Sequence, residues 1–357
     1  MGLFMLHATN LRASELTVNN REDVTAVGIG SAGIKIVSLL SRKTVLVDRF
    51  AYVSCDHEDF STVEPKDTIH IDSPVDQKLT PAIVRGLALR FHPRIRDAVS
   101  GSRVVFVVAG LGGATGSGLA PVVASIAREC GATPVGVAVM PFDFEKKMKF
   151  YAGVSLRRLR AAARGVVVID NETLLRSSSE DTTLADIYDT ANKAAVKALG
   201  SLLSRAAEGS RPLGLNKFLG TVLRDGYSLL GVSSSGSEDK AEDALAGAVV
   251  SLGKLGDPKE ATHALVSMNG DSTLTAPKVG LVVDRVGSAT GNPALDVEYG
   301  VDYSGTAQLQ VSLLASGFGL TKYDDYDPIA KVLGDRVLDD EMDCSLPEGL
   351  DTLQCCD

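Results

Sequence analysis

Residues 109–118 form a glycine-rich stretch that constrains the fold more than any other part of the chain. Five of the nine residues from 110 to 118 are glycine, and Thr115 and Ser117 add hydroxyl groups. The stretch follows an apolar, β-branched run at residues 104–108 and precedes a segment whose apolar side chains recur at helical spacing. Glycines in such a strand-to-helix turn allow positive φ and close approach of a ligand to the backbone. With the amides of a helix N-terminus, they predict a phosphate-binding loop, since a turn that served packing alone would need one or two glycines.

A second glycine motif lies near the beginning of the chain, at Gly28, Gly30 and Gly33. It follows an apolar run at residues 24–28 and precedes a helical pattern, which is the sequence context of a dinucleotide-binding fingerprint. The motif alone leaves two interpretations open, a Rossmann-type cofactor site or another kind of nucleotide site. Asp56 follows the next predicted strands, at a place where an acidic residue can hold a ribose hydroxyl in either case.

The predicted elements alternate between strand and helix, with polar or glycine-rich loops after the strands. This order predicts an α/β fold with a doubly wound, mostly parallel sheet whose site lies at the carboxyl ends of the strands. A long central helix follows, and then a second, smaller α/β domain in which residues 264–268, 278–285 and 307–315 are predicted as strands. The predicted divisions are an N-terminal extension (1–22), a nucleotide-binding domain (23–181), the central helix (182–206), the second domain (207–322) and an acidic tail (323–357).

Negative charge is concentrated at the C-terminal end of the chain. The 357 residues carry a net charge of −9, and residues 323–357 alone hold eleven acidic and two basic residues, which accounts for the whole excess. Low hydrophobicity with high charge predicts a mobile tail, while the balanced remainder argues against a nucleic-acid-binding protein. The five cysteines show no metal-ligand spacing and no apolar run reaches 18 residues. We therefore expect a reduced, cytoplasmic chain without a metal site or a transmembrane anchor.

Two further segments give the glycine-rich stretch a family context. Residues 141–145 (PFDFE) end one predicted strand and residues 168–172 (VIDNE) end the next. With the glycine-rich stretch and residues 235–242 (SGSEDKAE), they resemble the FtsZ branch of the FtsZ/tubulin family, over about residues 23–322.

The resemblance implies a domain that binds GTP or GDP, with which Mg²⁺ can associate. It implies head-to-tail filaments in which the second domain of one subunit supplies acids that position water at the nucleotide of the next. It also implies a role as a filament or scaffold in cell division or cell shape, with division or membrane-adaptor proteins docking on the C-terminal tail.

The resemblance further implies which residues bind the nucleotide. Glu145 matches a ribose-side glutamate, Asn171 matches an asparagine near the base and ribose, and Tyr188 stands where an aromatic ring stacks on guanine. The positions at which nucleotide contacts are expected are Gly28, Gly30, Ser31, Lys35, Asp56, Gly110, Gly112, Gly113, Ala114, Thr115, Gly116, Ser117, Glu145, Lys149, Asn171 and Tyr188.

Several positions depart from the family pattern. Lys193 replaces the aspartate that selects guanine, so the base specificity stays open. Lysines that replace neutral or acidic groups beside a polyphosphate are expected to stabilise the bound anion. The other replacements are Ala114 for a glycine, Ser54 and Lys35 for asparagines, Lys149 for an arginine, and Lys78 and Leu79 for paired glycines.

The catalytic segment departs most. The family carries two carboxylates in an N-x-D-x-x-D segment, and an ungapped alignment places Gly214 and Lys217 at these positions. No Asp or Glu lies between Arg211 and Arg224, so no catalytic residue of the family is retained. Because neither glycine nor lysine orients water as a carboxylate does, we expect GTP hydrolysis to be weak or lost.

Two alternatives to a weak GTPase follow from the same residues. The first is an active, assembly-dependent GTPase that uses a different acid, of which Glu208 and Asp225 are the nearest in sequence. The second is a nicotinamide-dependent (NAD) oxidoreductase built on the first glycine motif. It gives no reason for the stronger glycine-rich stretch at residues 110–118.

Overall fold

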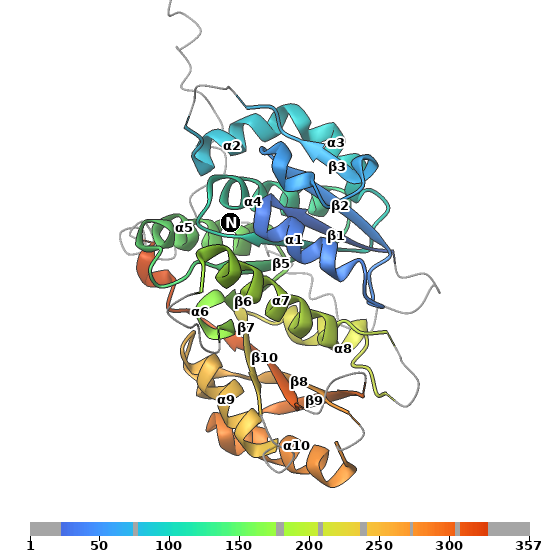
Figure 1. The fold of residues 1–357 in the computed structure, drawn as a ribbon, viewed down its shortest axis with the longest axis vertical. Coiled ribbons are helices and arrows are strands. Elements are labelled where there is room, and N and C mark those ends of the chain that lie inside the picture. The colour runs from blue at the N-terminus through green and yellow to red at the C-terminus, as the bar shows by residue number, and fades with distance from the viewer. Residues whose placement is uncertain are drawn as a thin grey trace, which may run out of the picture.

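The computed structural model describes residues 23–73, 78–175, 182–205, 210–235, 241–271, 274–303 and 308–327. Within them, ten strands form one continuous sheet in the order β3-β2-β1-β4-β5-β6-β7-β10-β8-β9 (Figure 1). The predicted α/β fold with a mostly parallel sheet is confirmed. The sheet also runs without a break from the first predicted domain into the second, which the sequence did not indicate.

The first six strands pair in parallel, and both of their faces are buried. Apolar side chains alternate between the faces, as in β4, where Val104, Phe106 and Val108 face one core cluster and Val105 and Val107 face the other. This is the pattern of a parallel sheet covered by helices on both sides. The strands are β1 (Val24–Ile29), β2 (Arg49–Ser54), β3 (Thr68–His70), β4 (Val104–Gly110), β5 (Thr133–Met140) and β6 (Gly165–Asp170).

Different helices cover the two faces of this parallel part. One core cluster is built on α1 (Gly30–Leu40), α7 (Leu184–Leu202) and α8 (Leu215–Val222). The other is built on α2 (Pro81–Ala88), α3 (His92–Val99), α4 (Ala114–Glu129) and α5 (Lys146–Ala162). The predicted central helix is α7, whose apolar stripe lies against the sheet as its helical spacing required.

Strand β7 (Tyr227–Ser234) joins the two parts of the sheet. It pairs in parallel with β6 at Val167–Ser228 and Val168–Leu229, and antiparallel with β10 (Gln310–Phe318). Strands β8 (His263–Asn269) and β9 (Asp296–Asp302) complete the sheet, and helices α9 (Ala241–Gly253) and α10 (Ala276–Thr290) pack against this second part. The short helix α6 (Asn171–Leu174) follows β6.

One predicted strand is a helix in the structure. Residues 278–285 were predicted to form a strand. They lie inside α10, where Val279, Val282 and Val286 are buried at intervals of three and four residues. The helical spacing of the apolar residues is therefore a better guide to the secondary structure of this segment than its content of β-branched residues. The strand of this region is β9, which had not been predicted.

The chain turns back after β10 and packs on the first part of the molecule. Residues 319–327, which include a short 3-10 helix at Asp324–Tyr326, lie against α5 at the left of Figure 1. The acidic tail was predicted to begin at residue 323, but Tyr323 is fully buried and Asp327 is also buried. Residues 328–357 of the predicted tail and the predicted extension, 1–22, lie outside the described residues.

Candidate nucleotide-binding site

The two glycine motifs lie side by side because β1 and β4 are neighbours in the sheet. Ile29 at the end of β1 is in register with Ala109 in β4, so both strand-to-helix turns leave the same edge. Gly30 (φ 65°) and Gly112 (φ 110°) have backbone angles that favour glycine. A Cβ on Gly116 would lie 2.1 Å from the carbonyl oxygen of Gly110. Part of the glycine content is therefore required by the turn itself.

Gly113 is different, because neither packing nor conformation requires a glycine there. Its φ is −78°, and an added Cβ would meet no atom within 4 Å. It is exposed and occupies the N-cap of α4, where no side chain caps the helix. The first amides of α4 are thus left for a ligand, at the positive end of the helix dipole. This open cradle fits the phosphate group that the sequence predicted.

The two hydroxyl residues of the loop have different surroundings. Ser117 is buried, and its Oγ accepts a hydrogen bond of 2.8 Å from the amide of Gly112, so it shapes the loop from within. Thr115 is only partly buried, at the mouth of the loop, and contacts the thiol of Cys55 at the end of β2. Burial raises the pKa of that thiol. Of the two predicted hydroxyl ligands, Thr115 is the better placed.

Glu145 and Tyr188 are brought together from different elements. The Tyr188 hydroxyl, on α7, donates to Oε1 of Glu145, while Oε2 accepts a 2.9 Å hydrogen bond from the amide of Phe142. The rings of Tyr188 and Phe142 pack edge to face at 5.3 Å. Burial, and then the Glu145 carboxylate, raise the pKa of Tyr188 above its ordinary value, so the phenol stays a donor. Glu145, the predicted ribose ligand, and Tyr188, the predicted base-stacking residue, are therefore in direct contact.

Asn171 occupies the first position of α6, directly after β6. It is buried, and its Oδ1 has no hydrogen-bond partner within the described part of the chain. Buried amide oxygens are normally satisfied, so an orphaned one at the carboxyl edge of a sheet indicates a missing ligand donor. Its position fits the predicted contact with a base and a ribose.

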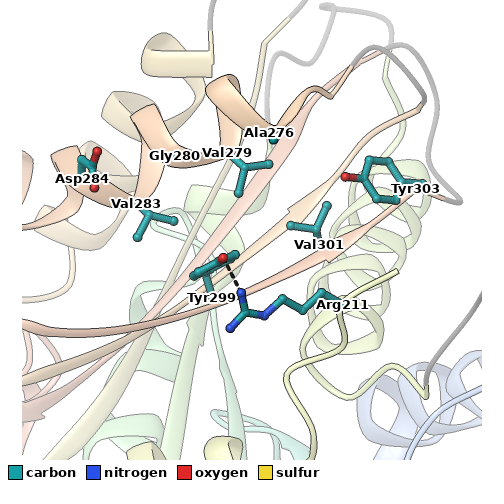
Figure 2. Close-up of a pocket in the computed structure, with 9 residues that line it drawn as sticks. All are labelled: Arg211, Ala276, Val279, Gly280, Val283, Asp284, Tyr299, Val301 and Tyr303. Carbon is teal, nitrogen blue, oxygen red and sulfur yellow. Dashed lines mark hydrogen bonds between the residues drawn. The ribbon is translucent and has the colours of Figure 1, made fainter. Parts of the chain in front are cut away.

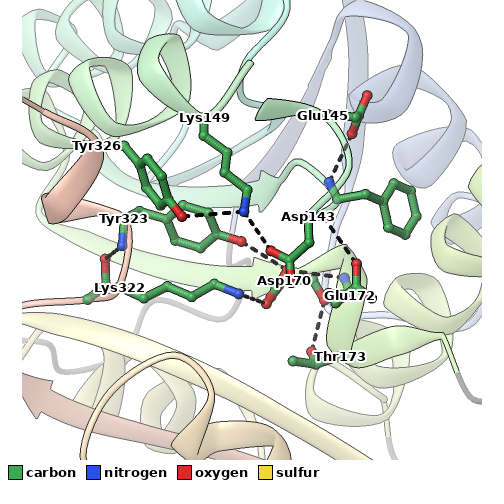
Figure 3. Close-up of polar contacts among 11 residues, drawn as sticks. Asp143, Glu145, Lys149, Asp170, Glu172, Thr173, Lys322, Tyr323 and Tyr326 are labelled. Carbon is green, nitrogen blue, oxygen red and sulfur yellow. Dashed lines mark hydrogen bonds and ion pairs between the residues drawn. The ribbon is translucent and has the colours of Figure 1, made fainter. Parts of the chain in front are cut away.

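Lys149 does not point to the phosphate loop. Its Nζ lies 2.7 Å from Oδ1 of Asp143 and 3.4 Å from the hydroxyl of Tyr326, in the segment after β10 (Figure 3). Burial alone would lower the pKa of Lys149, but the hydrogen bonds to Asp143 and Tyr326 outweigh it and raise the pKa. The hydrogen bond from Lys149 in turn lowers the pKa of Asp143. The role of Lys149 as a nucleotide ligand stays a prediction.

The remaining predicted positions lie around the rim. Ser31 and Lys35 on α1, and Lys78 before α2, are exposed. Asp56 caps a short 3-10 helix at His57–Phe60 by accepting from the amide of Glu58 at 2.9 Å. Ser54, which replaces a family asparagine, donates to Oδ2 of Asp59 at 2.5 Å. These residues lie around the predicted site, and their side chains do not contact one another at a common point.

Lys193 forms an ion pair on its own helix. Its Nζ lies 2.6 Å from Oδ2 of Asp189, one turn earlier on α7, and both side chains are mostly exposed. This chain lacks the family's carboxylate at position 193, but the carboxylate of Asp189 lies four residues earlier. The i,i+4 spacing of Asp189 and Lys193 is visible in the sequence, where Asp189 directly follows Tyr188.

The segment aligned with the family's catalytic acids contains an ion pair instead. Lys217 Nζ lies 2.5 Å from Oε2 of Glu298 on β9. Gly214, at the N-cap of α8, has φ 78° and ψ 154°. Asp225 lies in the turn beyond the other end of α8, and Glu208 lies outside the described residues. Glu298, 81 residues away in sequence, is the acid that sequence reasoning missed.

A cavity of about 380 Å³ lies between α10 and β9 (Figure 2). The guanidinium of Arg211 lies over the ring of Tyr299, 4.1 Å from its centroid, and its Nη1 donates to the Tyr299 hydroxyl. The mainly apolar wall opposite is formed by Val279 and Val283 of α10. The lining also includes one acidic side chain, Asp284 of α10.

Comparison with known proteins decides between the nucleotide interpretations. Residues 23–179 match the GTPase domain of the Tubulin/FtsZ family. The "Cell division protein FtsZ" of Buchnera aphidicola subsp. Schizaphis graminum is 30% identical over 318 residues, which span 86% of this chain and 82% of that protein. The chain belongs to the Tubulin/FtsZ family. The predicted resemblance to the FtsZ branch is confirmed, and the first glycine motif lies inside the GTPase domain, which favours a guanine nucleotide there over a dinucleotide.

Solved structures of the family are similar in fold. An FtsZ dimer from M. jannaschii superposes with a TM-score of 0.71 at 26% identity, covering 83% of this chain and 88% of that one. CetZ2 from Haloferax volcanii, described as a GTPγS-bound protofilament, gives 0.67 at 22% identity, covering 87% and 98%, and shows the shared fold alone. In the described part of this chain, no helix is long and apolar enough to cross a membrane. Those residues also contain no cluster of three or more metal-binding side chains.

Proposed function

We propose that this chain is an FtsZ-like guanine-nucleotide-binding protein that assembles head to tail and hydrolyses GTP weakly or not at all. The observation that carries the proposal is the contrast between two parts of the molecule. The phosphate cradle at Gly113 is open and uncapped, while the segment aligned with the catalytic acids holds Gly214 and the Lys217–Glu298 ion pair.

The described residues suit a guanine nucleotide at three points. The uncapped amides at the start of α4, with the hydroxyl of Thr115, support a phosphate-binding role for this loop. We infer that Glu145 binds a ribose hydroxyl and that the orphaned Oδ1 of Asn171 accepts from the sugar or base. The ring of Tyr188 offers a stacking face. Mg²⁺ would accompany the phosphates of the nucleotide, as is usual for nucleoside triphosphates.

Weak hydrolysis follows from what faces the next subunit in a head-to-tail assembly. Phosphoryl transfer depends on a positioned water and on charge stabilisation. Gly214 has no side chain, and Lys217 is a cation that neutralises the nearby carboxylate of Glu298. Losing an oriented water-positioning group commonly lowers a rate by a factor on the order of 10² to 10⁴. The protein would then act as a nucleotide-stabilised filament or scaffold.

Self-association and a cellular role are supported by the relatives alone. The similar solved structures include an FtsZ dimer and a CetZ2 protofilament, and the similar sequences are named cell division proteins. We therefore propose a filament or scaffold in cell division or cell shape, located in the cytoplasm. Division or membrane-adaptor proteins on the acidic tail remain part of the proposal.

An active GTPase that uses a different acid is the second candidate function, because Glu298 lies beside the segment aligned with the family's catalytic acids. Glu298 contacts Lys217 directly, whereas Asp225 lies past the far end of α8. If assembly displaced Lys217 from this pair, Glu298 would be left as a carboxylate facing the partner. Turnover that depends on Glu298 would favour this candidate.

Nucleotide content and turnover, measured on one purified sample, test the proposal. Nucleotide released by heating is identified by chromatography, and phosphate release is then assayed over a range of protein concentrations. We expect bound GTP or GDP without concentration-dependent turnover. A turnover that rises steeply with concentration would show that assembly completes an active site, and a sample that neither carries nor binds guanine nucleotide would overturn the proposal.

A further inference from the structure

The chain after β10 forms a strap across the nucleotide-binding edge. Residues 319–327, called here the C-terminal strap, leave the second part of the sheet at Phe318 and reach α5 and the end of β6 (Figures 1 and 3). Tyr323 is fully buried, whereas Leu320 is 68% exposed. Gly153 of α5 permits this contact, because a Cβ there would lie 2.7 Å from the carbonyl oxygen of Tyr323. The strap is thus closely packed on the helix.

The strap supplies two of the three polar partners of a buried carboxylate, Asp170. Nζ of Lys322 lies 2.5 Å from Oδ2, and the hydroxyl of Tyr323 donates to Oδ1 at 2.9 Å. The third partner is the amide of Glu172, at 3.1 Å, which makes Asp170 the N-cap of α6. Asp170 is fully buried, so these donors replace the water that an exposed carboxylate would bind. Burial, and then Asp170, raise the pKa of Tyr323, which keeps it a donor.

Asp170 is adjacent to the predicted base ligand. Asn171 follows it directly and begins the helical turn that Asp170 caps. The direction of the Asn171 side chain therefore depends on the turn that the Asp170 carboxylate holds. Asp170 therefore links the strap to the predicted nucleotide ligand Asn171.

A second contact of the strap leads to the loop that bears Glu145. The hydroxyl of Tyr326 lies 3.4 Å from Nζ of Lys149, and the same Nζ lies 2.7 Å from Asp143. The amide of Asp143 in turn donates to Oε2 of Glu172 at 3.2 Å, which joins the two nucleotide loops. Figure 3 shows these contacts as one connected network between the strap and both loops.

Two arginines of α5 fix the strap at its ends. Nε of Arg157 lies 2.5 Å from Oδ2 of Asp327, and Nη1 of Arg160 donates to the carbonyl of Gly319 at 3.1 Å. These contacts hold the strap without touching the nucleotide loops. The contacts of Lys322 and Tyr323 with Asp170 are therefore additional to these two contacts.

We propose that the C-terminal strap positions the two nucleotide loops. Tyr323 and Lys322 act as positioning residues for Asn171, and the packing of the strap on α5 and Asp170 therefore sets the dissociation rate of the nucleotide. The inference rests on the proposed binding of guanine nucleotide. If the donors are removed, the Asp170 charge loses its buried partners and turns toward water. The cap of α6 is then released and Asn171 loses its fixed direction.

The test compares three variants of the full chain. Tyr323→Phe removes one hydroxyl and keeps the ring, and Lys322→Met removes the charge while keeping much of the side-chain length. Tyr52→Phe is the matched control, because Tyr52 is also buried and its hydroxyl bonds to Ser41, while its strand, β2, is separated from β6 by three strands of the sheet. Two quantities are measured: the dissociation rate of a fluorescent GDP analogue, and hydrogen exchange of residues 142–146 and 170–175 without nucleotide.

We expect dissociation to be faster by about fivefold or more in Tyr323→Phe and in Lys322→Met, because each loses a hydrogen bond to a buried charge. Exchange of both loops should rise in these variants and stay at the wild-type level in Tyr52→Phe. Dissociation and exchange that match the Tyr52→Phe control in both variants would overturn the inference. If the wild type binds no guanine nucleotide, the proposed function fails, while exchange of the two loops still decides whether the strap positions them.

Discussion

Lys217 and Glu298 form an ion pair across 2.5 Å at the place where the family carries catalytic carboxylates. The pair joins the first turns of α8 to β9, two elements distant in sequence. Gly214, just before α8, has φ 78° and ψ 154°, a conformation that is essentially restricted to glycine. An aspartate at position 214 would be strained in this backbone, so a single substitution would not supply an unstrained carboxylate there.

The first prediction concerns the Lys217–Glu298 pair. We expect Glu298→Gln to change GTP turnover by less than about twofold, because the proposed protein hydrolyses GTP weakly and Glu298 is already neutralised by Lys217. Both side chains are more than one third exposed, so the pair contributes at most about 1 kcal/mol to stability. Phosphate release and thermal unfolding measure the two effects, with Asp225→Asn as the control. A fall in turnover on the order of 10² or more in Glu298→Gln would identify Glu298 as the replacement acid.

The second prediction separates the structural glycines of the phosphate loop from the open one. Gly113→Ala should fold, at a cost of no more than about 1 kcal/mol, since its Cβ meets no atom within 4 Å and its φ is −78°. The same methyl group projects into the cradle and should weaken guanine-nucleotide binding about tenfold. Gly116→Ala should unfold at markedly lower temperature, because its Cβ would lie 2.1 Å from the Gly110 carbonyl oxygen.

Thermal unfolding and binding of a fluorescent guanine nucleotide check both variants. Equal losses of stability in Gly113→Ala and Gly116→Ala would contradict the distinction between the two glycines. Unchanged nucleotide affinity in a folded Gly113→Ala would place the phosphates elsewhere.

The sequence predicted the parallel part of the fold well because its signals are local. Apolar runs at β1, β4, β5 and β6 are buried on both faces, and each is followed by a recognisable turn. The strand prediction for the α10 segment was wrong because its valines fit both the apolar run of a strand and the apolar stripe of a helix. Only packing against β9 and α9 decides between the two. The continuity of the sheet through β7 depends on two residue pairs that no local pattern specifies.

The site was predictable where family motifs lie in single loops, and not where side chains meet from distant segments. Glycines, Glu145 and Asn171 fall where the motifs placed them along the strand ends. Glu298 beside Lys217, and Lys322 and Tyr323 on Asp170, are separated from their partners by 81 to 153 residues. Such contacts arise from the topology of the sheet and leave no spacing in the sequence to read.

The third prediction concerns stability at mildly acidic pH. Burial, and then Arg224, lower the pKa of His263 below its ordinary value of 6.5, with Asp296 opposing them. In the unfolded chain this histidine binds a proton more readily than in the folded protein. Its neutral form therefore favours folding above pH 6.5, and this contribution is lost as the pH falls toward the folded-state pKa.

Thermal melts between pH 7.5 and 5 measure this effect. We expect His263→Gln to be less sensitive to pH over this range than the wild type. His92→Gln, a variant of a more exposed histidine that contacts Glu129, is the control. A wild type and a His263→Gln variant with the same pH dependence would contradict the assignment.

The last prediction concerns the base that the site selects. Lys193 replaces the family's guanine-selecting aspartate, and its charge is held by Asp189 one turn earlier on α7. We expect Lys193→Asp to increase the preference for GTP over ATP about tenfold, because a carboxylate accepts the guanine N–H groups that adenine lacks. Lys193→Ala is the matched control, since it breaks the ion pair without adding an acid.

Competition between GTP and ATP for a fluorescent nucleotide gives the ratio of the two affinities directly. If Lys193→Asp and Lys193→Ala give the same ratio as the wild type, position 193 does not face the base, and Asp189 is the carboxylate to test next by substitution with Asn.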